Sequence, residues 1–131
     1  MTMFDSIEGT VRARTPSAVV LDVHGVAFRL RIPLSTYEKV PAQGTARLLA
    51  RLHIQDDEVR LFGFATAEER QLFEDLIQSA SRVGPVKALA ILSSAGVKEI
   101  HAAIARGDVA FLKRIRGVGE KIAQRLVLEL K

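Results

Sequence analysis

The chain has 131 residues, and 48% of them are hydrophobic, enough to fill the core of one domain or of two small ones. It contains no cysteine, which excludes disulfide bonds and cysteine-ligated zinc sites, and its formal net charge of +4 favours a polyanionic partner. The N-terminal residues do not resemble a signal peptide and no apolar stretch has the length of a membrane span, so we expect a cytoplasmic protein without a membrane partner.

Apolar and polar residues alternate before Phe64, which predicts half-buried strands. Turn-forming residues interrupt the alternation at 15–17, 24–25, 33–44 and 55–58. This gives about five strands, with one short helical or turn segment at 34–40 before the fourth. The pattern predicts a small closed or partly open barrel of the oligonucleotide-binding (OB) kind, and an SH3-like barrel is the main alternative.

After Phe64 the apolar period becomes helical, and we place a domain boundary between residues 65 and 66. Thr66 is the expected N-cap of the first helix, with Glu69 as its capping-box partner. Shorter helices are predicted at 85–92, 97–105, 109–115 and from 120 onward. The predicted fold class is therefore α+β, with a five-stranded barrel domain at 1–65 and an all-α domain of two helix-turn-helix hairpins at 66–131.

One short pattern occurs twice in the second half, at 82–92 and 117–127, where a turn containing Val-Gly enters an apolar helix. Such a turn exposes backbone N–H groups at the positive end of the helix dipole, which favours binding of a phosphate backbone. Five cations and only one acid, Glu120, lie between residues 113 and 125, and they favour this reading over a plain helix-connecting turn. We also expect a bulky side chain at Gly119 to block close approach and to strain the turn. The candidate phosphate-binding residues are Arg82, Val83, Gly84, Lys87, Arg116, Gly117, Val118, Gly119, Lys121 and Arg125.

The acidic run Asp56, Asp57 and Glu58 falls at a predicted hairpin tip. From these residues alone a solvated turn is favoured over a metal site, because three consecutive residues at a tip rarely converge on one ion. The histidines show no metal-ligand spacing, and no phosphate-binding loop of the ATPase type is present. We therefore expect no cofactor, no metal and no catalytic residue.

The order and spacing of several segments resemble the RuvA family of Holliday junction-binding proteins. The segments are Met3-Phe4 through Gly9, Gly25 to Phe28 before Pro33, Leu61 to Phe64, Glu69 to Phe73, and the two hairpin turns. The resemblance implies an OB-type barrel followed by tandem helix-hairpin-helix motifs. It also implies a homotetramer, single or stacked as a pair, that holds four-way junction DNA open during recombination and repair.

The resemblance further implies a partner, the hexameric ATPase motor RuvB, which is engaged through a third, C-terminal domain, and it allows a junction resolvase as another partner. Since the sequence stops at Lys131 inside an apolar helical run, we expect the natural protein to continue beyond it. By the same resemblance, Asp56 and Asp57 are an acidic pin at the centre of the tetramer.

Two departures from the family pattern lie in the first hairpin. Arg82 stands where a glycine is usual, and Val86 stands where a basic residue is usual, with Lys87 one residue later. One residue on a helix is about 100° of rotation, so we expect Lys87 to point elsewhere. Two other functions stay open: a general duplex-binding module of a repair enzyme, and a metal-dependent nuclease using the Asp56 to Glu58 run.

Overall fold

The computed structural model describes residues 3–79 and 83–131, so Arg82 lies outside the described residues. The chain divides into two compact units, of which the first ends at Arg70 and the second begins at Gln71. The division falls within helix α2 (Ala67–Gln78), which begins three residues after the last strand ends at Phe64.

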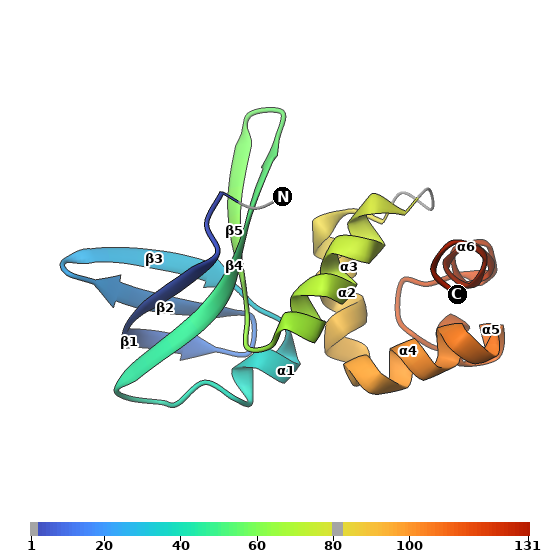
Figure 1. The fold of residues 1–131 in the computed structure, drawn as a ribbon, viewed down its shortest axis with the longest axis horizontal. Helices are drawn as coiled ribbons and strands as arrows, with labels where there is room; N and C mark the ends of the chain where they lie inside the picture. The colour runs from blue at the N-terminus through green and yellow to red at the C-terminus, as the bar shows by residue number, and fades with distance from the viewer. Residues whose placement is uncertain (1–2, 80–82) are drawn as a thin grey trace. The chain divides into compact units, whose positions relative to one another are not determined.

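The first unit is a closed five-stranded barrel (Figure 1). Its strands are β1 (Ser6–Thr15), β2 (Ala18–Val23), β3 (Val26–Arg31), β4 (Thr45–Gln55) and β5 (Glu58–Phe64). They follow the order β1-β2-β3-β5-β4, and β1 pairs with both β2 and β4. All neighbours are antiparallel except β3 and β5, whose parallel pairing at Arg31 and Phe62 closes the barrel. The predicted OB-type barrel is therefore confirmed.

Alternation along the strands fills the barrel core, because every second side chain points inward. Val19, Leu21, Leu30, Leu48 and Ala50 are among the buried residues. At the strand ends, however, alternation does not place the apolar side chains in the core. The predicted half-buried positions Val26, Ile54 and Val59 are exposed, and Figure 1 shows the β4–β5 hairpin projecting beyond the barrel wall.

Besides its strands, the first unit contains a short helix and the start of α2. Helix α1 (Leu34–Tyr37) lies in the segment between β3 and β4, as predicted. Thr66 caps α2: the Glu69 backbone N–H donates to Thr66 Oγ1 at 3.2 Å, and Thr66 Oγ1 donates to Glu69 Oε1 at 2.8 Å. The predicted N-cap is confirmed, and the Glu69 carboxylate accepts from the Thr66 hydroxyl.

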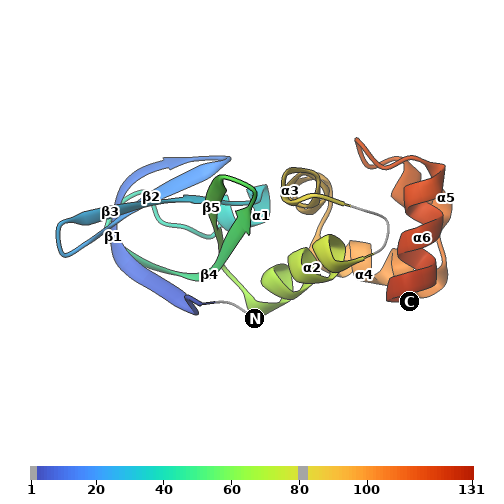
Figure 2. The ribbon, with the colours of Figure 1, turned by 90° about the horizontal axis from the view of Figure 1, so that it is seen from above.

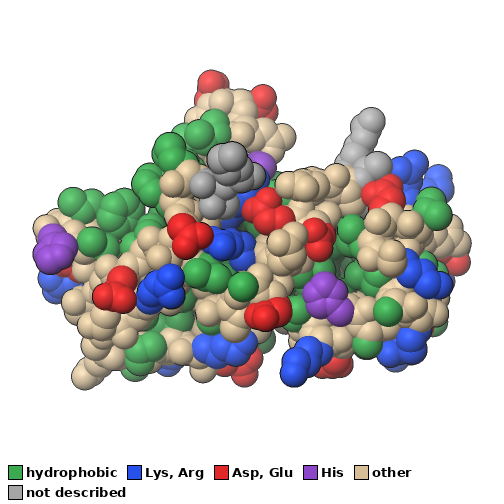
Figure 3. Space-filling model, in the orientation of Figure 1, with side chains coloured by type: hydrophobic (Ala, Val, Ile, Leu, Met, Phe, Trp, Pro, Cys, Tyr) green, Lys and Arg blue, Asp and Glu red, His purple; other side chains and the backbone are tan. Residues whose placement is uncertain are grey.

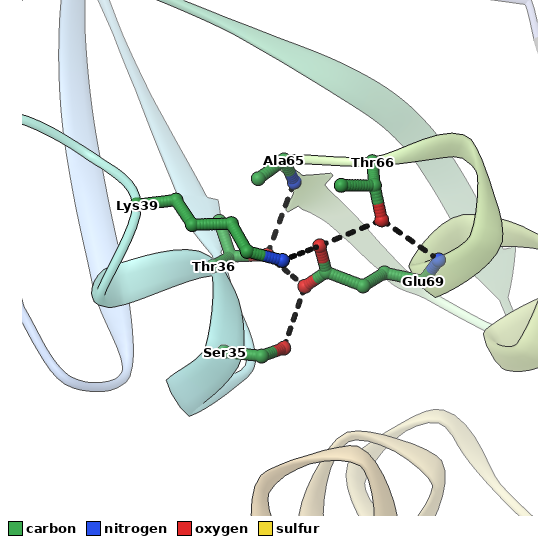
Figure 4. Close-up of polar contacts among 6 residues, drawn as sticks. All are labelled: Ser35, Thr36, Lys39, Ala65, Thr66 and Glu69. Atoms are coloured by element: carbon green, nitrogen blue, oxygen red, sulfur yellow. Dashed lines mark hydrogen bonds and ion pairs between the residues drawn. The ribbon is translucent and has the colours of Figure 1, made fainter. Parts of the chain in front are cut away.

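The Glu69 carboxylate also joins α2 to α1, although its side chain is buried (Figure 4). It accepts hydrogen bonds from Ser35 Oγ at 2.6 Å and Thr36 Oγ1 at 2.7 Å, and Lys39 Nζ lies 3.3 Å from Oε1. Burial raises the pKa of Glu69, but the hydrogen bonds from Ser35, Thr36 and Thr66 and the charge of Lys39 outweigh it and hold the pKa below its usual range. The carboxylate is therefore charged at neutral pH.

The second unit is helical, as Figure 2 shows from a second direction. After α2 come α3 (Pro85–Ser94), α4 (Val97–Arg106), α5 (Val109–Lys113) and α6 (Glu120–Leu130). Their apolar faces bury Phe73, Ile91, Leu92, Ile100 and Leu126, among others. Among the described residues no single helix is long and apolar enough to cross a membrane; α3 and α4 taken together, with a 97° bend between them, meet the same test of length and composition.

Helix α5 ends two residues earlier than predicted. Asp108 caps its start by accepting from the Phe111 backbone N–H at 2.9 Å. At the other end the Arg114 N–H donates to Phe111 O and the Ile115 N–H donates to Leu112 O, which are bonds of three residues rather than four. The tighter turn ends the α-helix at Lys113 and leads into the second glycine turn.

Candidate nucleic-acid interface

The two repeats form the same local structure. In each, a buried valine, Val83 or Val118, is followed by a glycine that is the N-cap of a helix. Gly84 has φ −79° and ψ 171°, and Gly119 has φ −86° and ψ −179°, so the two backbones agree to within about ten degrees. The buried valine fixes each turn to the core, and the glycine after it is exposed at the head of α3 or α6.

Neither Gly84 nor Gly119 is required by the fold. Both have extended backbone angles that any residue adopts, and a Cβ added at either would meet no atom of the described residues within 4 Å, their neighbours in the chain aside. Neither helix has a side-chain cap, although Ser, Thr, Asp and Asn are the usual N-caps. The N–H groups of the first turn are therefore left open on the side where glycine leaves room.

The start of α4 provides a comparison, because it also follows a glycine, Gly96. A Cβ at Gly96 would lie 3.2 Å from Glu99 Oε1, so a carboxylate of the same helix lies close to this N-terminus. The expected strain of a side chain at Gly119 is wrong, because its φ is negative. The residue that needs glycine for its backbone is Gly117, whose φ is 87°.

Cations surround the second turn, and Figure 3 shows Lys and Arg side chains over the α5 and α6 part of the second unit. Two have acidic partners: Lys113 Nζ lies 3.6 Å from Glu120, and Arg125 lies 3.5 Å from Glu129. In the described part of the chain, the exposed side chains of Arg116 and Lys121 have no acidic partner. Among the predicted cations of this turn, Arg116 and Lys121 are thus the freest to meet an anion.

The first turn differs in its charge. Val86 occupies the position that Lys121 has in the second repeat, and its side chain is 57% exposed. Lys87 is half-buried, and its Cε lies 3.9 Å from the position of a Cβ at Gly117. Lys87 thus lies beside the second turn, a relationship between residues 30 positions apart that the sequence pattern did not indicate.

The acidic tip lies at the far end of the β4–β5 hairpin, where Figure 3 shows acidic side chains with hydrophobic ones below them. Asp56 and Asp57 are exposed and form the two-residue turn, with Asp56 in the left-handed region at φ 54°. Glu58 instead pairs with Arg60 on β5. Within residues 3–79 and 83–131, no group of three or more His, Asp or Glu side chains is arranged to hold a metal ion.

Two family models match successive parts of the chain. The model described as the RuvA N terminal domain matches residues 3–63, and the SAM-like helix-hairpin-helix tandem model matches residues 73–131. Over 130 residues the chain is 42% identical to the Holliday junction branch migration complex subunit RuvA of Geobacter sulfurreducens, covering 98% of this chain and 65% of that protein. The chain belongs to the RuvA family.

A second RuvA relative, from Alkalilimnicola ehrlichii, is 45% identical over 130 residues and is covered to 62% of its length. The chain therefore spans slightly less than two thirds of the RuvA proteins that it matches. The two matched regions fall on the barrel and on the helical hairpins respectively, which confirms the predicted succession of an OB-type barrel and a tandem helix-hairpin-helix domain.

Proposed function

We propose that this chain binds four-way junction DNA through the phosphate backbone, as the non-catalytic subunit of a branch-migration complex in recombination and repair. The observation that carries the proposal is the matched pair of Gly84 and Gly119, two exposed helix N-caps that the fold itself does not require. The name of its relatives, Holliday junction branch migration complex subunit, supports the same function.

The chemistry of the two turns suits phosphate. Free N–H groups at the first turn of α3 and α6, together with the positive end of each helix dipole, attract an anion, and the absence of a Cβ allows close approach. Arg116 and Lys121 add charge at the second turn. Because phosphates are the same for every base, such contacts position a duplex without reading its sequence.

The proposed role of the acidic tip is repulsive. In a homotetramer, single or paired face to face, copies of Asp56 and Asp57 would meet near the symmetry axis. Their charges would disfavour phosphates at the crossover and keep the arms of the junction apart, while the glycine turns hold the duplexes further out. A preference for branched over linear DNA then follows from charge and shape.

The remaining assignments also belong to this proposal. ATP hydrolysis is supplied by the hexameric motor RuvB, a junction resolvase is a further partner, and the complex works in the cytoplasm. We propose residues 1–65 and 66–131 as the barrel and DNA-binding domains. Arg82, Val83, Gly84 and Lys87 join the residues of the second turn as the phosphate-binding set.

Gel-shift titration tests the function directly, using a four-way junction and a linear duplex of the same sequence, each in two unrelated base sequences. We expect tighter binding to the junction, little dependence on base sequence, and a log-log salt slope of roughly 0.9 per phosphate neutralised. Equal affinity for junction and duplex would instead identify a general duplex-binding module. Cleavage that requires a divalent ion would identify a nuclease.

Native mass measured with and without a synthetic junction tests the proposed assembly. We expect four copies of the chain, or eight, on one junction. A complex with one copy would contradict the tetramer and, with it, the role given to the acidic tip.

A further inference from the structure

We infer that Lys87, which belongs to the helix of the first hairpin, binds phosphate at the turn of the second hairpin. This inference rests on the proposed function, since it needs a DNA backbone at the two turns. It goes further by stating that the two hairpins are unequal, because the lysines of both hairpin helices, Lys87 and Lys121, serve the second turn.

The position of the Lys87 stem carries the inference. Among the described residues, and leaving aside the two neighbours of Gly117 in the chain, its Cε is the only atom within 4 Å of the place where a Cβ of Gly117 would be, at 3.9 Å. A Cβ at that place would be in ordinary van der Waals contact with Cε, so the apolar stem of Lys87 lies beside the bare backbone of Gly117. The ammonium group is one bond beyond Cε and is therefore close to the second turn.

The charge of Lys87 is available to a ligand. Lys113, at the same turn, has its ammonium 3.6 Å from Glu120, whereas among the described residues no acidic side chain pairs with Lys87. Lys87 is also half-buried, so its stem is already ordered by packing. A cation that is held in place before the ligand arrives loses less conformational entropy on binding.

The helix of the first hairpin has no cation at the position that matches Lys121. Val86 stands at the position of Lys121 and cannot bind an anion through its side chain. Within the described residues, the head of α3 therefore offers the backbone N–H groups that follow Pro85, which itself has none, without a lysine at the position of Val86. The second turn offers the N–H groups after Gly119 together with Lys87, Arg116 and Lys121.

A set of matched variants tests the assignment. Lys87→Met keeps the apolar stem and removes the charge, Lys87→Arg keeps the charge, and Val86→Ala is the neighbouring control. In the double variant Val86→Lys with Lys87→Val, composition and net charge are unchanged, but the cation moves to the position that matches Lys121. Each is titrated with junctions in which one phosphate at a time is replaced by a neutral methylphosphonate, and thermal melting confirms that each variant is folded.

We expect Lys87→Met to weaken junction binding roughly three- to tenfold and to lower the salt slope by about 0.9, the change for one phosphate contact. Lys87→Arg and Val86→Ala should bind nearly as the parent does. The neutral linkage that cancels the effect of Lys121→Met should also cancel the effect of Lys87→Met. The exchanged double variant should lose sensitivity to that linkage and become sensitive to another.

Two outcomes overturn the inference while leaving the proposed function in place. In one, Lys121→Met weakens binding but Lys87→Met binds as tightly as the parent. In the other, the effects of Lys87→Met and Lys121→Met map to different phosphates, which would assign Lys87 to the first turn. If no variant and no neutral linkage changes junction binding, the proposed backbone contact itself fails.

Discussion

The Thr36 hydroxyl donates a 2.7 Å hydrogen bond to the Glu69 carboxylate, and both side chains are buried. Thr36 belongs to α1 and Glu69 to α2, so the contact joins two segments that are separated by β4 and β5. Thr36 Oγ1 also accepts a hydrogen bond from the Ala65 backbone N–H at 3.1 Å (Figure 4). Each polar group in this cluster is satisfied by another, so removing one leaves its partners buried without a hydrogen bond.

Replacing Glu69 with Ala should lower the free energy of unfolding by about 3 kcal/mol. The change leaves the hydroxyl groups around Glu69 without their hydrogen-bond acceptor and removes the ion-pair partner of Lys39. Urea unfolding followed by circular dichroism measures the change. The matched control is Glu68→Ala, since Glu68 is exposed one residue earlier in the same helical turn. Equal stability of the two variants would show that the cluster does not stabilise the fold.

The contribution of Glu69 should also depend on pH. Its pKa is lower in the folded protein than in the unfolded chain, so the stabilisation is fully present above the unfolded value of about 4.3 and is lost as the pH falls through the folded value. The difference in unfolding free energy between the parent and Glu69→Gln should stay constant from about pH 8 to about pH 5 and narrow below about pH 4. A difference that narrows as pH rises from neutral would contradict the assignment.

Serine substitutions should have different effects on stability and DNA binding at the two glycines of the second turn. Gly119→Ser should keep or slightly raise the stability, because serine is a good N-cap and the backbone angles suit it, but its side chain should weaken DNA binding by taking the N–H groups and the space. Gly117→Ser should cost about 1 kcal/mol of stability, because φ at this position is 87°. Melting curves and junction titrations on both variants give the comparison. Undiminished binding by Gly119→Ser would remove this helix end from the interface.

Changing Asp56 and Asp57 together to Asn should tighten binding, and more for linear duplex than for a junction, because an open junction already keeps its phosphates away from the axis. Asn tolerates the left-handed backbone of Asp56, so the turn should be preserved. The gain should shrink at high salt. Glu58→Gln is the control and should change binding less, since the charge of Glu58 is already paired with Arg60.

Titrations of the Asn variant with magnesium and with a chelator distinguish repulsion from metal binding. Repulsion predicts the same gain in duplex affinity under both conditions. Unchanged duplex affinity, together with loss of a magnesium-dependent effect seen in the parent, would favour a metal site at the tip.

The fold was predictable where the pattern is local. The strands and the turns between them leave alternation and turn residues in the sequence, and the Thr66 cap lies three residues from Glu69. The exposure of Ile54 and Val59 was not predictable, because alternation continues along a hairpin after it has left the barrel. The partners of Glu69 in α1 were also missed, since a contact between residues more than 30 positions apart leaves no periodic signal.

In the candidate site, too, local patterns were predictable and long-range contacts were not. Repetition of the pattern identified Gly84 and Gly119, and the structure gives them nearly identical backbones. Rotation by one residue led us to expect that Lys87 points away from the direction of the usual basic residue, but its place beside Gly117 depends on how α3 packs in the second unit. Sequence alone also assigned the strain to the wrong glycine, because φ angles are set by the whole turn.

The short helix α1 depends on residues on both sides of it in the chain. It has four residues, too few for an isolated helix to be stable in water. Arg14 on β1 donates to Tyr37 O and Val40 O at its C-terminal side and lies 4.4 Å from the centre of the Tyr37 ring, whereas Glu69 binds the hydroxyls of Ser35 and Thr36. During synthesis, therefore, this segment should stay unstructured at the ribosome until Glu69 has left the exit tunnel, which makes the closing of this end of the barrel a late event in folding.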